Sequence, residues 1–157
     1  MDRSPHFGQQ IKYLHNAFEQ AMNHNLAAQG LTGAQSFFLG FISFNAAKGN
    51  AVHSKEIAKH FKLRHSTVSG ILRRLEAGGF IEFIPDEKDH RLKRIILTKK
   101  AENSHQRAFQ IFDELEKKML NGFTKDEAEL FYLFLMRAAD NIGVDHLSDI
   151  KKGDDNL

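Results

Sequence analysis

The strongest constraint on the fold comes from two neighbouring segments with helical apolar periodicity, residues 54–61 and 65–77. In each segment the apolar side chains recur at helical spacing, which gives a helix with one buried face. These side chains are Ile57, Ala58 and Phe61 in the first segment, and Val68, Ile71, Leu72 and Leu75 in the second. Only residues 62–64 separate the segments, and such a short link is typical of a helix-turn-helix. We expect Ser54 to be the N-cap of the first helix, because a serine oxygen can accept a hydrogen bond from the first turn.

A β-hairpin is predicted directly after the second helix. Gly78 and Gly79 end that helix, since glycine readily adopts the left-handed conformation common at helix C-termini. Two short runs of β-branched and aromatic residues, 81–84 and 94–97, then flank the charged loop 85–93. The helix-turn-helix and the hairpin together predict a winged helix.

Further helices are predicted on both sides of the winged helix. An apolar stripe at helical spacing runs from Phe7 to Leu26, and the strongly apolar segment 37–44 predicts a central core helix. After Thr98, an expected N-cap, another helix is predicted to about Leu120. The predicted fold is therefore mainly α with a small β-wing (α+β), in which a winged helix-turn-helix lobe joins a helical lobe.

Capping boxes begin two of these helices. Thr32 with Gln35, and Thr124 with Glu127, have the spacing in which each side chain caps a backbone N–H of the other residue. The helix after Thr124 carries an uninterrupted apolar run at residues 130–136. A helix that is apolar all round must be covered on every side, which favours a partner subunit over a monomer that folds its own ends across the helix.

The net charge of +2 is unevenly distributed along the chain. Residues 48–100 contain 13 Lys and Arg against 6 Asp and Glu, a net charge of +7, whereas residues 101–157 contain 7 against 12, a net charge of −5. On the helix at 65–77, small polar residues and arginines lie opposite the apolar stripe. Small side chains let the backbone approach a DNA groove, and arginine can bond to guanine or phosphate. The basic lobe is thus predicted to bind a polyanion, in preference to the alternative of a merely solvated basic surface.

Other classes of function lack a sequence signature. The absence of cysteine excludes disulfides and thiol-based sensing by this chain. No nucleophile and base have motif spacing and no glycine-rich phosphate loop occurs, so no enzymatic activity is predicted. The nine histidines are scattered, so no metal site and no cofactor is predicted. Without a signal-peptide core or an apolar stretch of membrane-spanning length, the chain is expected to be cytoplasmic and to have no membrane partner.

Several segments resemble the MarR family of bacterial transcription regulators, in the family's order and spacing and over nearly the whole chain. They are Leu31–Gln35, Ser66–Ser69, Leu75–Ile81, Asp89–Arg91 and Ile96–Thr98. The Asp-x-Arg signature after a helix-turn-helix is the most specific of these features. Two residues depart from the family pattern. Arg64 occupies the usual Ser or Asn cap position, which affects capping or DNA contacts, and Ala101 replaces a common glycine.

The resemblance implies a homodimeric, ligand-responsive repressor that binds a pseudo-palindromic operator in double-stranded DNA. It also implies one domain over residues 1–157, with dimerisation helices at about 5–29 and 101–147 and the winged helix-turn-helix at about 51–98. By position Arg91 is the family's minor-groove arginine, and Asp89 is the carboxylate that orients it. A narrow minor groove concentrates negative potential, which attracts such a guanidinium.

Three sets of site residues follow from these patterns and from the resemblance. The expected DNA contacts are Arg64, His65, Ser66, Thr67, Ser69, Gly70, Arg73, Arg74, Lys88, Asp89, Arg91 and Lys93. The expected dimer interface contains Ile11, Leu14, Phe131, Leu135, Ile142 and Leu147. A small-molecule effector is expected near His15, Phe18, Phe38, Phe41 and Phe112, although aromatic side chains at helical spacing more often form a core.

Two other interpretations remain open at the level of sequence. A winged helix can serve as a protein-interaction module, in which the basic face and the wing bind an acidic protein. Alternatively, the chain is a metal-responsive regulator that senses metal through His15, His24 or His105 together with carboxylates.

Overall fold

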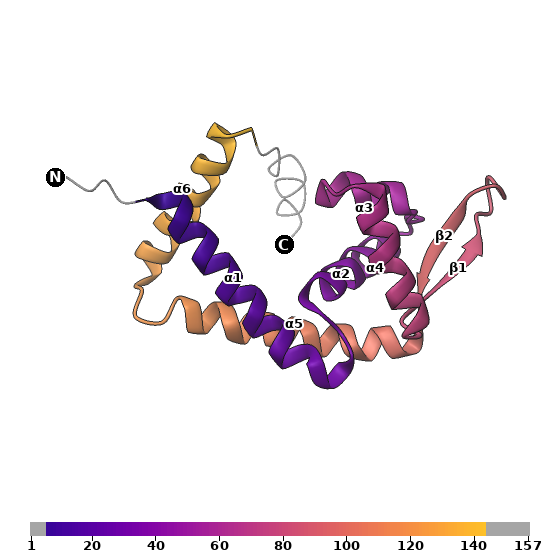
Figure 1. Ribbon diagram of the computed structural model, residues 1–157, viewed down its shortest axis with the longest axis horizontal. Helices are drawn as coiled ribbons and strands as arrows, with labels where there is room; N and C mark the ends of the chain where they lie inside the picture. The colour runs from indigo at the N-terminus through magenta and orange to yellow at the C-terminus, as the bar shows by residue number, and fades with distance from the viewer. Residues whose placement is uncertain (1–5, 144–157) are drawn as a thin grey trace. The chain divides into compact units, whose positions relative to one another are not determined.

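The computed structural model describes residues 6–143 and consists of helices with one small hairpin (Figure 1). The α-helices are α1 (Phe7–Leu26), α2 (Gly33–Ala47), α3 (Ser54–Phe61), α4 (His65–Ala77), α5 (Lys99–Met119) and α6 (Lys125–Asn141). A short 3-10 helix, η1 (Ala27–Gln29), follows α1, and the strands are β1 (Ile81–Pro85) and β2 (Lys93–Leu97). The predicted mainly helical fold with a small β-wing is confirmed. No helix in the described range has the length and apolar character needed to span a bilayer.

The chain divides into two compact units, with the boundary between Glu116 and Lys117. The first unit holds α1 to α4, the hairpin and most of α5, and the second holds the end of α5 and α6. That residues 1–157 form one domain stays a prediction. Leu147, expected at the dimer interface, lies outside the described residues.

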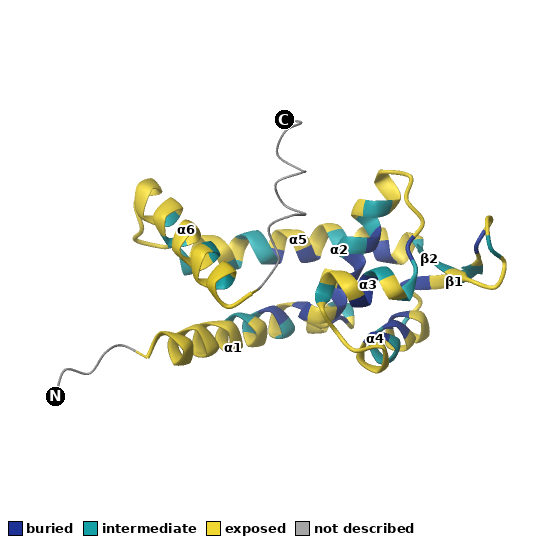
Figure 2. Cartoon of the chain, turned by 90° about the horizontal axis from the view of Figure 1, so that it is seen from above, coloured by how far each residue is buried: buried dark blue, intermediate teal, exposed yellow. Residues whose placement is uncertain are grey.

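The core of the first unit is centred on α2, as the apolar pattern predicted. Buried residues (dark blue in Figure 2) line the faces at which α2, α3, α4, β1 and the neighbouring parts of α1 and α5 meet. Among the largest fully buried side chains are Phe38, Met22, Leu26, Leu39, Ile42, Ile57, Leu72, Leu75 and Ile81. Removing such side chains from water is the main favourable term in folding this lobe.

The start of α2 is fixed by the predicted capping box and by a contact from α1. The backbone N–H of Thr32 donates to the Gln35 Oε1 at 2.8 Å, and the Gln35 N–H donates to the Thr32 Oγ1 at 3.3 Å. The Gly33 N–H also donates to the Asn23 Oδ1 at 2.7 Å, which ties α2 to α1. Three backbone donors of a helix N-terminus are thereby satisfied.

The N-cap of the first helix of the helix-turn-helix lies one residue earlier than predicted. The N-cap of α3 is His53 and not Ser54, and the N–H of His53 donates to the Glu56 Oε2 at 2.9 Å. Ser54 has the better side chain for a cap by general preference, but His53 makes tertiary contacts that decide the register. At the other end of α3, Lys62 adopts the left-handed conformation (φ 51°) and turns the chain toward α4.

The hairpin is antiparallel, and its register pairs Ile81 with Leu97 and Pro85 with Lys93. Each strand is one residue longer than predicted. The Asp86 N–H donates to the Leu92 carbonyl at 2.9 Å, which continues the pairing into the loop. The hairpin projects away from α4 in Figure 1, and most residues of its loop are exposed.

The base of the hairpin is anchored to the start of α5. The Thr98 hydroxyl donates to the Gly79 carbonyl at 2.6 Å, and the Lys100 Nζ donates to the Gly78 carbonyl at 2.7 Å. The Ala101 N–H donates to the Thr98 Oγ1 at 3.3 Å, which confirms Thr98 as a cap. These bonds connect the end of α4 to the first turn of α5.

In the second unit, α6 begins at the predicted capping box. The Thr124 N–H donates to the Glu127 Oε2 at 2.8 Å, and the Glu127 N–H donates to the Thr124 Oγ1 at 3.3 Å. None of the residues of α6 is buried in the single chain, and most of its large apolar side chains are exposed. These are Leu130, Tyr132, Leu133, Phe134 and Leu135.

Candidate nucleic-acid interface

The exposed face of α4 carries most of the predicted groove contacts. Arg64, His65, Ser66 and Thr67 at the start of α4 are exposed, as are Arg73 and Arg74 further along. Ser69 and Gly70 are half-buried between them, while the buried face holds Val68, Leu72 and Leu75. The structure thus brings all eight predicted residues of this segment to one helix and its N-terminal end.

Two residues of this face have unusual local surroundings. Arg64 stands at the N-cap of α4 and makes no side-chain cap hydrogen bond within the described chain, since a guanidinium offers no acceptor. Its side chain is therefore available for other contacts. At Gly70, a Cβ atom would meet nothing within 4 Å in the described structure, so the helix backbone lies open to the surface here.

The wing loop is organised by Asp86, a buried carboxylate that sequence analysis did not single out. Its Oδ1 accepts hydrogen bonds from the backbone N–H groups of Lys88 at 2.8 Å and Asp89 at 3.1 Å. Its Oδ2 lies 2.9 Å from the Nε2 of His53. The Lys88 N–H bond, followed by the bond from His53, lowers the pKa of Asp86 from 3.8 to about 2. The carboxylate is therefore ionised near neutral pH and can only accept hydrogen bonds.

Arg91 is held by Asp89 at the tip of the wing, as the resemblance implied. The Arg91 Nε donates to the Asp89 Oδ1 at 3.1 Å, and its second guanidinium nitrogen donates to the Oδ2 at 3.3 Å. The side-chain bond from Arg91 is the main reason why the pKa of Asp89 is lowered. The Arg91 side chain nevertheless stays 91% exposed, so the guanidinium is oriented but available to a ligand.

The other basic residues of the wing differ in how far they are free to contact a ligand. Lys88 and Lys93 are exposed, as expected for phosphate contacts. Arg94 instead pairs with Glu87 across the loop at 2.7 Å, and its side chain is largely covered.

The residues expected at a dimer interface leave apolar surface uncovered in the single chain. On α1, Ile11 and Leu14 are exposed, and in the second unit Leu135 and Ile142 are exposed while Phe131 is half-buried. Ile142 is 80% exposed. Each unit thus exposes large apolar side chains of the kind that protein interfaces cover.

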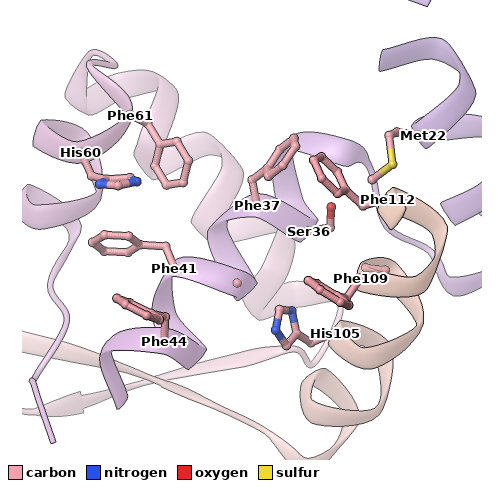
Figure 3. Close-up of a pocket in the computed structure, with 12 residues that line it drawn as sticks. Met22, Ser36, Phe37, Phe41, Phe44, His60, Phe61, His105, Phe109 and Phe112 are labelled. Atoms are coloured by element: carbon pink, nitrogen blue, oxygen red, sulfur yellow. The ribbon is translucent and has the colours of Figure 1, made fainter. Parts of the chain in front are cut away.

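An open aromatic pocket of about 380 Å³ lies between α2, α3 and α5 of the first unit (Figure 3). Its lining includes Phe37, Phe41, Phe44, His60, His105, Phe109 and Phe112. Two of the five residues expected near an effector, Phe41 and Phe112, line this pocket.

The other three expected effector residues lie elsewhere. Phe38 is fully buried in the core and stacks on Phe61, with ring centroids 4.9 Å apart. Phe18 packs edge-on against Phe112 without lining the pocket. His15 is exposed on α1 and lies 3.9 Å from Glu19. Helical spacing could not separate lining from core positions, because both are apolar and face the inside of the unit.

Metal binding has no geometric support in the part of the chain that the structure describes. Within residues 6–143, no three His, Asp or Glu side chains come together in an arrangement suited to a metal ion. The histidines named in the metal-sensing alternative are distributed over α1 and α5.

A helix-turn-helix with an exposed arginine-bearing face, followed by a hairpin with an exposed arginine at its tip, defines the winged helix-turn-helix class. Residues 29–92, which include all of the helix-turn-helix, match the model of the MarR family. The matched segment is less than half of the chain, and over it the chain is similar to the MarR family.

Three proteins are similar to this chain over most of its length, one in sequence and two in solved structure. The HTH-type transcriptional regulator YybA of Bacillus subtilis is 26% identical over 144 residues, which cover 92% of this chain and 93% of YybA. The crystal structure of MarR is 25% identical and has a TM-score of 0.74, covering 90% of this chain and 94% of MarR. The structure of Staphylococcus aureus MepR in complex with DNA has a TM-score of 0.78 at 23% identity, covering 88% of this chain and 99% of MepR. The last comparison bears on the fold alone.

Proposed function

We propose that this chain is a transcription regulator that binds a specific sequence in double-stranded DNA as a homodimer. The observation that carries the proposal is the pairing of two exposed cationic elements on one winged helix. These elements are the arginine-bearing face of α4 and the tip of the wing, where Asp89 orients Arg91. MepR and Escherichia coli MarR, which share the fold, have each been solved with DNA.

Each element suits a different groove. The α4 face presents small side chains near Gly70, so the helix can lie deep in a major groove, while Arg73 and Arg74 bind guanine or phosphate. The wing places Arg91 where it can enter the adjacent minor groove, and Lys88 and Lys93 contact phosphates. A regulator that binds operators on the bacterial chromosome acts in the cytoplasm.

The uncovered apolar side chains of α1 and α6 support assembly as a homodimer. A second copy can cover Ile11, Leu14 and Leu135, together with their exposed neighbours. A twofold dimer presents two α4 helices to successive major grooves, about 34–36 Å apart, which predicts a pseudo-palindromic operator.

We further propose that an apolar or aromatic small molecule regulates binding from the pocket between α2, α3 and α5. The pocket brings together the winged lobe, through His60 on α3, and the long helix, through His105 and Phe112 on α5. A ligand that prefers one arrangement of these elements by about 1–3 kcal/mol changes operator affinity from several-fold to about a hundredfold.

Repression is the proposed effect on transcription, because a dimer bound over a promoter blocks access without further contacts. One relative, BadR of Rhodopseudomonas palustris, is named as a transcriptional activatory protein and is 26% identical over 84 residues. A reporter gene behind the selected operator, with and without the protein, decides the direction for this chain.

The decisive experiment is selection of genomic fragments from the source organism by the purified protein, followed by affinity measurements on the enriched site. We expect one pseudo-palindromic sequence to bind at least about a thousandfold more tightly than a scrambled duplex at the same salt concentration. Affinity should fall steeply as salt rises, since phosphate contacts release counterions. Equal affinity for both duplexes would refute the proposal, and tight binding of an acidic protein without DNA affinity would favour the protein-interaction alternative.

The effector proposal has a separate test with three DNA targets. A ligand found by thermal-shift screening should lower affinity for the full operator far more than affinity for one half-site or for non-specific DNA. Equal loss on all three targets would indicate competition at the DNA-binding face and would refute regulation through dimer geometry.

A further inference from the structure

The imidazole of His53 lies between two carboxylates that belong to different elements. Its Nε2 is 2.9 Å from the Asp86 Oδ2 in the wing loop, and its Nδ1 is 3.1 Å from the Glu56 Oε2 in α3. Because Asp86 is ionised and can only accept, the His53 Nε2 carries the hydrogen of their bond. The His53 side chain is largely covered, so solvent competes weakly for this contact.

Asp86 determines the shape of the loop that carries Arg91. One oxygen of its carboxylate holds the N–H groups of Lys88 and Asp89, and the other accepts from His53. Asp89 in turn binds the guanidinium of Arg91. A continuous chain of hydrogen bonds therefore leads from the cap of α3 to the tip of the wing.

Within the described structure, few other contacts anchor the hairpin to the rest of the first unit. A two-stranded hairpin is marginally stable alone, so its direction depends on what anchors it. At the base, the Ile95 N–H donates to the Val52 carbonyl at 2.7 Å, and the Thr98 hydroxyl binds the Gly79 carbonyl. The bond between His53 and Asp86 is the side-chain anchor at the loop end of the hairpin, close to Arg91.

We infer that His53 is a positioning residue for DNA recognition, which holds the wing through Asp86 so that Arg91 meets the minor groove while α4 lies in the major groove. This inference rests on the proposed DNA-binding function. His53 itself does not touch DNA, and its effect passes entirely through the wing.

Two substitutions of His53 distinguish its positioning role from its helix-capping role. One preserves capping of α3 but loses the bond to Asp86, and the other does the reverse. In His53→Asn the amide reaches only about as far as Nδ1, so it caps α3 well but cannot reach Asp86. In His53→Gln the amide lies about where Nε2 lies, so it can donate to Asp86 although glutamine is a poor N-cap. His53→Ser, another good cap with a short side chain, is the substitute if the Asn variant fails to fold.

The readout is affinity for the selected operator, measured with the full-length protein at fixed salt. We expect H53Q to stay within about threefold of the unsubstituted protein. We expect H53N to lose about 5- to 150-fold, the range for one lost DNA contact. In an R91A background, H53N should cost no more than about twofold further, since the contact it positions is already gone. Equal losses for H53N and H53Q, a larger loss for H53Q, or full additivity with R91A would each overturn the inference.

A measurement without DNA separates this inference from the proposed function. Amide hydrogen exchange of Lys88 and Asp89, whose N–H groups bind Asp86, should accelerate in H53N and remain slow in H53Q. If the unsubstituted protein binds no specific duplex, the proposed function fails, whereas the exchange rates still decide whether His53 holds the wing. Unchanged exchange in H53N would overturn the positioning role whatever the DNA result.

Discussion

Arg91 is the single residue whose geometry bears most directly on DNA recognition. We predict that R91A lowers operator affinity by about 1–3 kcal/mol, because the guanidinium is exposed and oriented by Asp89. The free energy of unfolding should change by less than about 0.5 kcal/mol, since the side chain is at the surface. Fluorescence anisotropy with labelled operator and thermal denaturation measure the two quantities.

R107A is the matched control for this substitution. It removes an exposed arginine from α5, outside the helix-turn-helix and the wing. Comparable affinity losses in R107A and R91A would show that total charge matters and that the wing tip has no special role.

Asp86 predicts a pH dependence of stability. Its pKa falls from 3.8 to about 2 in the folded protein, so the unfolded chain binds the proton first as the pH is lowered. The contribution of Asp86 to stability is thus complete above about pH 4 and is lost as the pH falls toward 2. The difference in unfolding free energy between the unsubstituted protein and D86N should be largest above pH 4 and shrink below it. Urea denaturation at several pH values measures this difference, and a constant difference would contradict the assignment.

Individual residues were predictable where the partners lie close in sequence. The pairing of Asp89 with Arg91, two residues apart, followed from the resemblance and is confirmed by their hydrogen bonds. The role of His53 could not be predicted, because its partner Asp86 is 33 residues away. Asp86 itself had a local signal, since an Asp that opens a loop often binds the N–H groups that follow it. Whether Arg91 contacts DNA stays a prediction.

At the level of elements, apolar periodicity was the informative property. It predicted α1 and α4, and the spacing of Thr with Gln or Glu three residues later predicted the capping boxes of α2 and α6. The structure confirms all four. The error at the start of α3 has a tertiary cause, since His53 is engaged by the wing as well as by Glu56. Local cap preference contains no information on such long-range contacts.

The recognition helix contains a residue that is unfavourable for helix stability. Gly70 lies inside α4, where glycine costs about 0.5–1 kcal/mol relative to alanine. A methyl group there would meet no atom within 4 Å in the described structure, so G70A should raise the free energy of unfolding by about that amount. If this backbone lies against DNA, the same methyl group should lower operator affinity.

Opposite changes in stability and affinity are therefore expected for G70A. Chemical denaturation of the free protein gives the first quantity, and titration of labelled operator gives the second. An affinity that stays equal or rises would indicate that the Gly70 side of α4 does not enter a groove.

At the level of the whole molecule, the exposed apolar residues of α6 predict that this helix lies in the dimer interface. We expect L135D to weaken the dimer at least about a hundredfold, because a carboxylate buried without a partner costs several kcal/mol. Sedimentation velocity over a range of concentrations measures the change, with circular dichroism to follow folding. N121D, which adds the same charge in the loop before α6, should leave the dimer intact. A normal dimer in L135D would place the interface elsewhere.

The pocket between α2, α3 and α5 shows where sequence reasoning reaches its limit. The apolar segment 37–44 was correctly expected to form a central core helix. Phe38 and Phe41 are three residues apart on α2, yet one is buried and stacks on Phe61 while the other lines the pocket. Only the packing of α3 and α5 around α2 decides between these positions, and that packing is a property of the folded unit.

The anchorage of α5 to the end of α4 makes the long helix a lever. At its N-terminal end, Thr98 and Lys100 bind the carbonyls of Gly79 and Gly78. The pocket residues His105 and Phe112 lie further along the same helix. At 1.5 Å per residue, Phe112 is about 18 Å from Lys100. A tilt of α5 by about 5° around a pivot near Phe112 would therefore move its N-terminal end by about 1.6 Å. Such a tilt, too small to alter the fold of the unit, would displace the C-terminus of α4 through the hydrogen bonds to Gly78 and Gly79.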